Sequence, residues 1–216
     1  MKANKRNIFR GIEFVLLFFG IPLYLYIDSL ITHPVLLLLP VTAGVLLFLW
    51  LKKDFRFNSL VRMDVSRDMI LKNCIVMLFT ALFLIAFVFF SDRENLFRLP
   101  RENTRIWLLL CLFYPLFSAY LQEIIFRTFL FERYASLFKK SWLLIFASGF
   151  TFSFVHIVYY SPVSVISTFV AGIYLAWVYA KTGSVLFTTI LHSIFGILVF
   201  TTGLGQHFWL NMDKYL

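Results

Sequence analysis

The sequence predicts an all-α protein, a polytopic membrane helix bundle with about seven to eight transmembrane helices. Hydrophobic residues make up 61% of its 216 residues and the mean hydropathy is +0.84, values that exclude an ordinary soluble domain. The apolar residues, including 28 phenylalanines, form continuous runs, which favours spanning helices over a porin-like barrel. Because we find no internal repeat or linker, we expect one integral membrane domain over residues 1–216.

Seven apolar segments are long enough to cross the hydrocarbon core of a bilayer, which takes about 20 helical residues. Polar connections separate them, among them an expected turn over 28–34 and a hairpin apex at Lys139-Lys140. Pro115 interrupts the fourth segment, so a break near 115–121 that creates an eighth span is the alternative. The segments cover about residues 9–27, 35–51, 70–90, 106–130, 142–159, 163–180 and 184–202.

Lysine and arginine give the chain a net charge of +9. They lie between the apolar runs and form no basic face, so we expect the lipid bilayer and no nucleic acid as a partner. With seven spans, fifteen of the 20 basic residues fall on the side of the N-terminus and five on the other. The positive-inside rule therefore predicts a multi-pass protein of the inner or plasma membrane with a cytoplasmic N-terminus.

A glutamate and an arginine interrupt the fourth apolar segment. On a helix, Glu123 and Arg127 are four residues apart and share one face, where they can pair. An ionisable side chain at bilayer depth costs about 2.5 kcal/mol or more on insertion scales, so it is a candidate for function. The alternative is a structural ion pair that holds two helices together.

Two histidines are expected at the depth of Glu123. If the apex of the hairpin lies at Lys140, Glu123 precedes it by 17 residues and His156 follows it by 16. His192, at the far end of the next hairpin, falls within about two helical turns of the same depth. A carboxylate and two imidazoles that converge in a bilayer predict a functional site. The remaining histidines, expected at the interface, are His33 and His207.

Three short motifs resemble those of the CPBP family (CAAX protease and bacteriocin-processing, or Abi) of intramembrane proteases. Gln122-Glu123-Ile124-Ile125-Phe126-Arg127 is similar to the family's Glu-Glu-x-x-x-Arg motif, and Phe152-Ser153-Phe154-Val155-His156 matches its Phe-x-x-x-His motif. His192 stands where the third motif, His-x-x-x-Asn or Asp, begins. The resemblance covers about residues 106–200, the expected catalytic core.

The resemblance implies an intramembrane endopeptidase, a glutamate protease that acts on a membrane-associated peptide or protein. In the implied mechanism, Glu123 and His156 hold the attacking water and His192 stabilises the tetrahedral intermediate. No cofactor is implied. Zinc held by the same three residues is the second choice, because two histidines and a glutamate form a known catalytic zinc set. The supporting residues are Gln122, Arg127 and Phe152.

Two positions depart from the family pattern. The first motif begins with Gln122, whose neutral amide cannot take a proton from water, and the third ends in Gly196 where Asn or Asp is expected. Ser193, Thr188 or Thr189 are the side chains that could substitute for the one missing at Gly196. These departures favour one alternative, a catalytically impaired relative that acts as a binding or immunity protein. A second alternative is a small proton-coupled transporter in which the buried Glu123 and the histidines relay protons.

Overall fold

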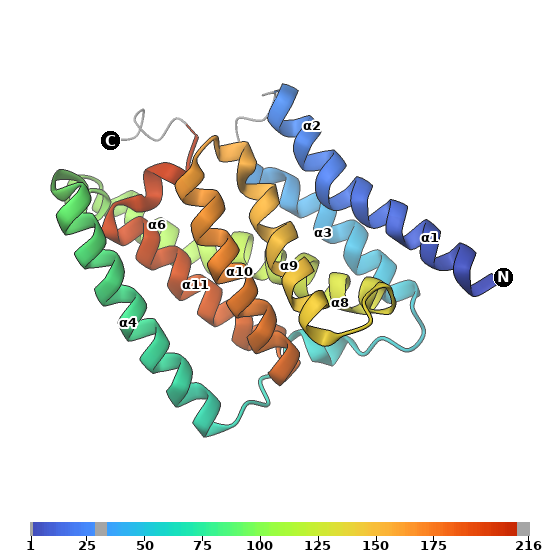
Figure 1. Cartoon of the computed structure of the whole chain (residues 1–216). Coiled ribbons are helices and arrows are strands. Elements are labelled where there is room, and N and C mark those ends of the chain that lie inside the picture. The colour runs from blue at the N-terminus through green and yellow to red at the C-terminus, as the bar shows by residue number, and fades with distance from the viewer. Residues whose placement is uncertain (1, 29–33, 211–216) are drawn as a thin grey trace.

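The computed structural model describes residues 2–28 and 34–210, with the side chains of 2–4, 34 and 35 left aside. The expected turn over 28–34 lies almost entirely outside the described residues, as does His33. Every regular element in the described part is helical, which confirms the all-α prediction (Figure 1). The α-helices are α1 (Lys2–Val15), α2 (Ile21–Asp28), α3 (Pro34–Leu51), α4 (Arg67–Ser91), α5 (Arg98–Glu102), α6 (Thr104–Tyr114), α7 (Tyr120–Glu123), α8 (Leu130–Tyr134), α9 (Ser141–Val155), α10 (Pro162–Thr182) and α11 (Val185–Thr202). The π-helical and 3₁₀ segments are η1 (Leu16–Gly20), η2 (Phe57–Leu60), η3 (Arg93–Asn95), η4 (Pro115–Ala119), η5 (Ile124–Phe129), η6 (Ala135–Leu137), η7 (His156–Tyr159) and η8 (Leu204–Phe208).

Six helical segments of the described chain are long and apolar enough to cross a membrane, and the shorter apolar helix α3 adds a seventh candidate. The prediction of a polytopic bundle is therefore confirmed. The segment Thr104–Leu137 is one helical run of 34 residues, so the break near 115–121 that would create an eighth span is not observed. Pro115 instead opens the π-helical segment η4, a local widening of the kind that accommodates a proline within a helix.

Local signals in the sequence fix where the spanning helices begin and turn. The side-chain oxygens of Ser66, Asn103 and Ser184 accept hydrogen bonds from backbone N–H groups in the first turns of α4, α6 and α11. Lys139 and Lys140 lie between η6 and α9, as predicted for the apex of that hairpin. At the end of α10, Gly183 adopts the left-handed conformation that lets the chain reverse into α11.

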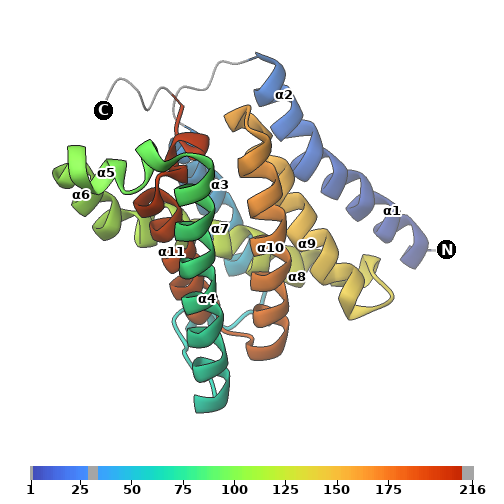
Figure 2. The same cartoon turned by 60° about the vertical axis from the view of Figure 1, so that its left-hand side comes forward.

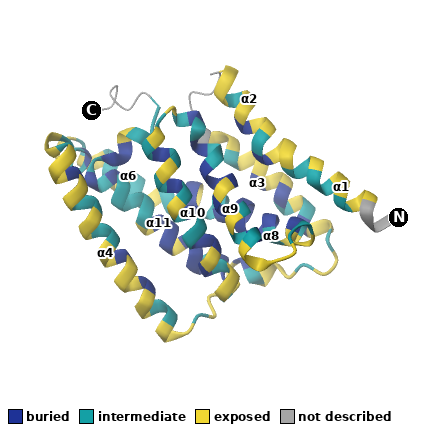
Figure 3. Ribbon diagram, viewed as in Figure 1, coloured by how far each residue is buried: buried dark blue, intermediate teal, exposed yellow. Residues whose placement is uncertain are grey.

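The α7–η5 segment lies in the middle of the bundle. It contacts α3, α9 and α11, whereas α4 packs along the outside of α11 (Figures 1 and 2). The outward faces of the peripheral helices are exposed and apolar (Figure 3). On α4, Phe79, Phe83 and Phe90 are 66%, 65% and 85% exposed, a surface that suits lipid and not water. The polar side chains of the central segment are thereby kept away from the lipid.

Two glycines allow α9 and α10 to approach closely. A Cβ atom at Gly149 would lie 2.6 Å from the backbone nitrogen of Ile173, and one at Gly172 would lie 3.0 Å from the carbonyl oxygen of Gly149. Small residues at a helix crossing permit this close packing in membranes, where dispersion contacts hold helices together. The crossing fixes α9, and with it the position of the motif that ends in His156.

We expect Gly149→Leu to destabilise the purified protein by about 1–3 kcal/mol or more, because the larger side chain must push α10 away from α9. Thermal unfolding in detergent measures the effect. Gly11→Leu is the matched control, since a Cβ atom at Gly11 has no neighbour within 4 Å. Equal melting temperatures for the two variants would contradict the close crossing.

Candidate active site

Glu123 forms the centre of the site. It lies at the end of α7 with its side chain fully buried, and its two oxygens face different partners. His192 on α11 donates from Nδ1 to Oε1 over 2.8 Å, and the Nε of Arg127 lies 3.2 Å from Oε2. Because a carboxylate can only accept, His192 carries a hydrogen on Nδ1, which leaves its Nε2 atom for other contacts. The Glu and Arg of the first motif and the His of the third therefore meet directly.

Arg127 is anchored by α9. Its side chain is fully buried, Nη1 donates to Ser148 Oγ over 3.0 Å, and the guanidinium lies over the Phe152 ring at 5.1 Å. Ser148 Oγ in turn donates to the carbonyl oxygen of Phe126 over 2.7 Å. Buried charges are tolerated when they are paired and hydrogen-bonded in this way. The orientation of Arg127, and through it of Glu123, thus depends on α9.

His156 lies where α9 gives way to the 3₁₀ segment η7. Its Nδ1 is 2.6 Å from the carbonyl oxygen of Phe152, so Nδ1 carries the hydrogen and Nε2 holds a free lone pair. The Phe152 ring is 4.8 Å from the His156 ring and 5.3 Å from the His192 ring, between centroids, and so bridges the two imidazoles. No hydrogen bond in the described part of the chain joins His156 to Glu123; a water shared by these two residues stays a prediction.

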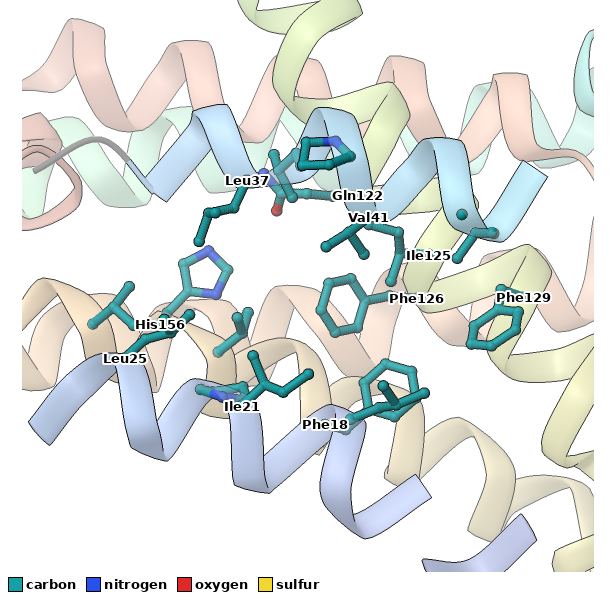
Figure 4. Close-up of a pocket in the computed structure, with 18 of the residues that line it drawn as sticks. Phe18, Ile21, Leu25, Leu37, Val41, Gln122, Ile125, Phe126, Phe129 and His156 are labelled. Carbon is teal, nitrogen blue, oxygen red and sulfur yellow. The ribbon is translucent and has the colours of Figure 1, made fainter. Parts of the chain in front are cut away.

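An apolar cavity of about 440 Å³ lies beside this site (Figure 4). Gln122, His156 and Tyr159 contribute polar groups to its wall, whereas the rest of the wall comes largely from apolar side chains of α2, α3, η1 and η5. Figure 4 shows Gln122 and His156 directed into the same space. The neighbouring residue Glu123 points the other way, toward α11. Two consecutive residues of the first motif therefore face different surroundings: Gln122 faces the cavity and Glu123 faces α11.

Several buried polar atoms of the site keep hydrogen-bonding capacity. Gln122 donates from Nε2 to Ser118 Oγ over 2.8 Å, and its buried Oε1 has no partner within the described part of the chain. Glu123 Oε2 and Arg127 Nε are in ionic contact, but neither makes a hydrogen bond of good geometry. Buried groups of this kind are suited to bind water or a polar substrate group.

The geometry does not form a metal-binding site from the residues proposed for zinc. Among the described residues, no three His, Cys, Asp or Glu side chains are placed to hold a metal ion. Glu123 and His192 bind each other, and His156 directs Nδ1 to a backbone carbonyl.

The three hydroxyl side chains that could replace a side chain at Gly196 differ in whether they already donate a hydrogen bond. Ser193 donates to the carbonyl of Thr189 over 2.7 Å and Thr188 to that of Val185 over 2.9 Å. The Thr188 hydroxyl also lies within reach of the Glu123 carboxylate. The buried Thr189 hydroxyl has no hydrogen-bond partner among the residues that the structure describes. The space beside Gly196 is filled by Tyr114, a residue that sequence reasoning did not single out.

Ser148 was also missed, although a signal for it existed. It precedes His156 by eight residues, about two helical turns, and lies four residues before Phe152 on the same face of α9. A polar residue on the face that carries the second motif is expected to reach the site. No comparable pattern identifies Tyr114, which lies nine residues before Glu123 and beyond a π-helical segment.

Comparison with known families agrees with this geometry. The family model described as type II CAAX prenyl endopeptidase Rce1-like matches residues 104–198. The chain carries a domain of this CAAX protease family. The domain runs from the start of α6 into α11 and includes Glu123, His156 and His192. No curated protein and no solved structure matches the chain.

The match to the CAAX protease family model and the several apolar spans together support a multi-pass membrane protein that carries a domain of a protease family. The helices α1 to α4 lie outside the matched segment. Even so, α2 and α3 supply much of the cavity wall beside the CAAX protease domain. The cavity is therefore formed jointly by the domain and the N-terminal helices.

Proposed function

We propose that the protein hydrolyses a peptide bond in a membrane-associated peptide or protein, at a site formed by Glu123, His156 and His192. The observation that carries the proposal is the 2.8 Å hydrogen bond between Glu123 and His192, which are 69 residues apart in the chain. A purely structural ion pair between helices is less well supported, because Glu123 and Arg127 belong to the same helical run. A buried carboxylate that orients an imidazole is typical of hydrolytic sites.

The free atoms of the site suggest a role for each residue. His156 lies in the cavity wall with its basic Nε2 available. We therefore assign it the role of general base, which takes a proton from the attacking water. Gln122 Oε1 can accept a hydrogen bond and orient that water without taking its proton. The Glu123 carboxylate is engaged by His192, so we assign it the task of orienting His192. His192, when protonated, donates from Nε2 to the oxyanion of the tetrahedral intermediate.

The cavity indicates the substrate class within this proposal. Its wall is apolar apart from Gln122, His156 and Tyr159, so it suits large apolar side chains next to the scissile bond. Such a segment would reach the site from the membrane and not from water. The basic residues continue to favour a cytoplasmic N-terminus, because most of the lysines and arginines outside the apolar segments lie on that side.

Replacement of His156 tests the proposed function. We expect His156→Ala to lower the rate at which purified protein in liposomes cleaves a membrane-tethered peptide by about 10²–10⁴-fold, the usual contribution of a general base. Cleavage products are quantified by mass spectrometry. A wild-type protein that binds such peptides without cleaving them would instead favour the binding-protein alternative.

His207→Ala is the matched control. His207 lies in η8, outside the membrane spans, and its Nδ1 is 2.9 Å from Ser161 Oγ. Burial lowers the pKa of His207, and this effect exceeds the opposing effect of the nearby Asp92 carboxylate. We assign it no catalytic role. Equal rates for wild type and His156→Ala would remove His156 from the mechanism.

A further inference from the structure

Tyr114 occupies the space that Gly196 leaves beside His192. Gly196 follows His192 by four residues, so the two lie on the same face of α11. A Cβ atom at Gly196 would overlap Cε1, Cζ and the hydroxyl oxygen of Tyr114. The Tyr114 ring meets the His192 ring in a T-shaped arrangement, with the centroids 6.1 Å apart. The phenol and the imidazole are therefore direct neighbours.

Tyr114 lies on the side of the site that holds the Glu123–His192 pair. It is close enough to Glu123 to interact electrostatically with the carboxylate, and close enough to Tyr159 for the same kind of interaction. Tyr159 is one of the polar residues in the cavity wall. Tyr114 thus lies beside the Glu123–His192 pair and near Tyr159, which lines the cavity where the substrate is expected.

We propose that the Tyr114 hydroxyl is a catalytic hydrogen-bond donor, which acts with His192 to stabilise the oxyanion; the inference rests on the proposed function. A neutral phenol carries one O–H donor. A donor already directed at the site when the reaction begins is an effective way to stabilise developing negative charge. The same placement accounts for Gly196, because any side chain there would displace the phenol ring.

The chemical step balances without a further reactant. The water oxygen bonds to the substrate carbonyl carbon while His156 takes a proton from the water, and the carbonyl oxygen becomes the oxyanion. The C–N bond then breaks, the carbonyl re-forms, and the leaving amine receives the proton held by His156. Tyr114 donates a hydrogen bond throughout and keeps its own proton.

Tyr114→Phe tests the proposal, because it removes the hydroxyl and keeps the ring that packs against Phe200 with centroids 6.1 Å apart. We expect kcat to fall at least tenfold, toward the roughly 10²–10³-fold loss seen when one oxyanion donor is removed, with KM and melting temperature little changed. Tyr120→Phe is the control, since its hydroxyl donates to the Leu60 carbonyl away from the site. A fall in kcat of less than tenfold would overturn the role of Tyr114.

A paired exchange provides a second test. Tyr114→Ala opens the space beside Gly196, and the double variant Tyr114→Ala with Gly196→Asn places an amide donor there. We expect the double variant to be more active than Tyr114→Ala; equal or lower activity would contradict the shared position. The two proposals fail differently. An inactive wild type would refute the proposed function together with this inference, whereas an active wild type with an equally active Tyr114→Phe would refute this inference alone.

Discussion

Glu123→Gln is expected to lower the rate of peptide hydrolysis by about 10²–10⁴-fold, as when the carboxylate of a catalytic triad is replaced by its amide. The carboxylate accepts the hydrogen of His192 Nδ1 over 2.8 Å, and this contact fixes which imidazole nitrogen is free. An amide can present its N–H₂ group to the same nitrogen and select the opposite tautomer. It also loses the negative charge that would balance a protonated His192. Initial rates with a membrane-tethered peptide measure the change.

Glu102→Gln is the control for this substitution. Glu102 accepts a hydrogen bond from Arg98 over 2.9 Å on a partly exposed surface of α5. Like Glu123 and Arg127, these two residues form an ion pair four residues apart, but their pair is not buried. Replacement of Glu102 should leave the rate within about twofold, because exposed pairs contribute little. A Glu123→Gln protein that kept the wild-type rate would show that the carboxylate serves only the fold.

Arg127→Met is expected to destabilise the protein by about 3–5 kcal/mol, the cost of removing one partner from a buried ion pair. The guanidinium is fully buried, and its removal leaves the Glu123 carboxylate without the arginine charge while Ser148 loses a donor. Methionine keeps much of the length and apolar volume of the arginine side chain. Unfolding in mixed detergent micelles provides the measurement.

The double variant Arg127→Met with Glu123→Gln separates charge from packing. A neutral amide no longer needs the guanidinium, so the double variant should recover part of the stability lost in Arg127→Met. If the double variant instead lost the sum of the stabilities lost in the two single variants, the unpaired charge of Glu123 would not explain the destabilisation of Arg127→Met. Arg101→Met is the control, because Arg101 makes its contacts on the exposed surface of α5.

The spanning helices could be predicted from the sequence because lipid imposes a strong constraint on each of them. Apolar runs of sufficient length marked the spans, and Lys139-Lys140 marked the apex of the hairpin whose second arm is α9. Counting residues from such turns placed Glu123 and His192 at similar depth, and they lie 2.8 Å apart. Helical rise is regular enough for such counting to succeed over one or two spans. The extent of the single domain, residues 1–216, stays a prediction.

The orientation of the side chains could not be predicted in the same way. Depth along a helix says little about its rotation, and the π-helical segments η4 and η5 shift the rotation of the central run on either side of α7. Within α7, Gln122 faces the cavity and Glu123 faces α11. The place of Tyr114 beside Gly196 depends on how α6 packs against α11, a tertiary contact that leaves no local pattern in the sequence.

A double-mutant cycle on Glu123 and His192 tests most directly whether they act as one catalytic unit. The rates of wild type, Glu123→Gln, His192→Ala and the double variant are measured with one membrane-tethered peptide in liposomes. Residues that act as a unit are strongly non-additive, so the double variant should be no more than about threefold slower than the slower single variant. Losses that multiply in the double variant, or a wild-type protein without turnover, would contradict the account.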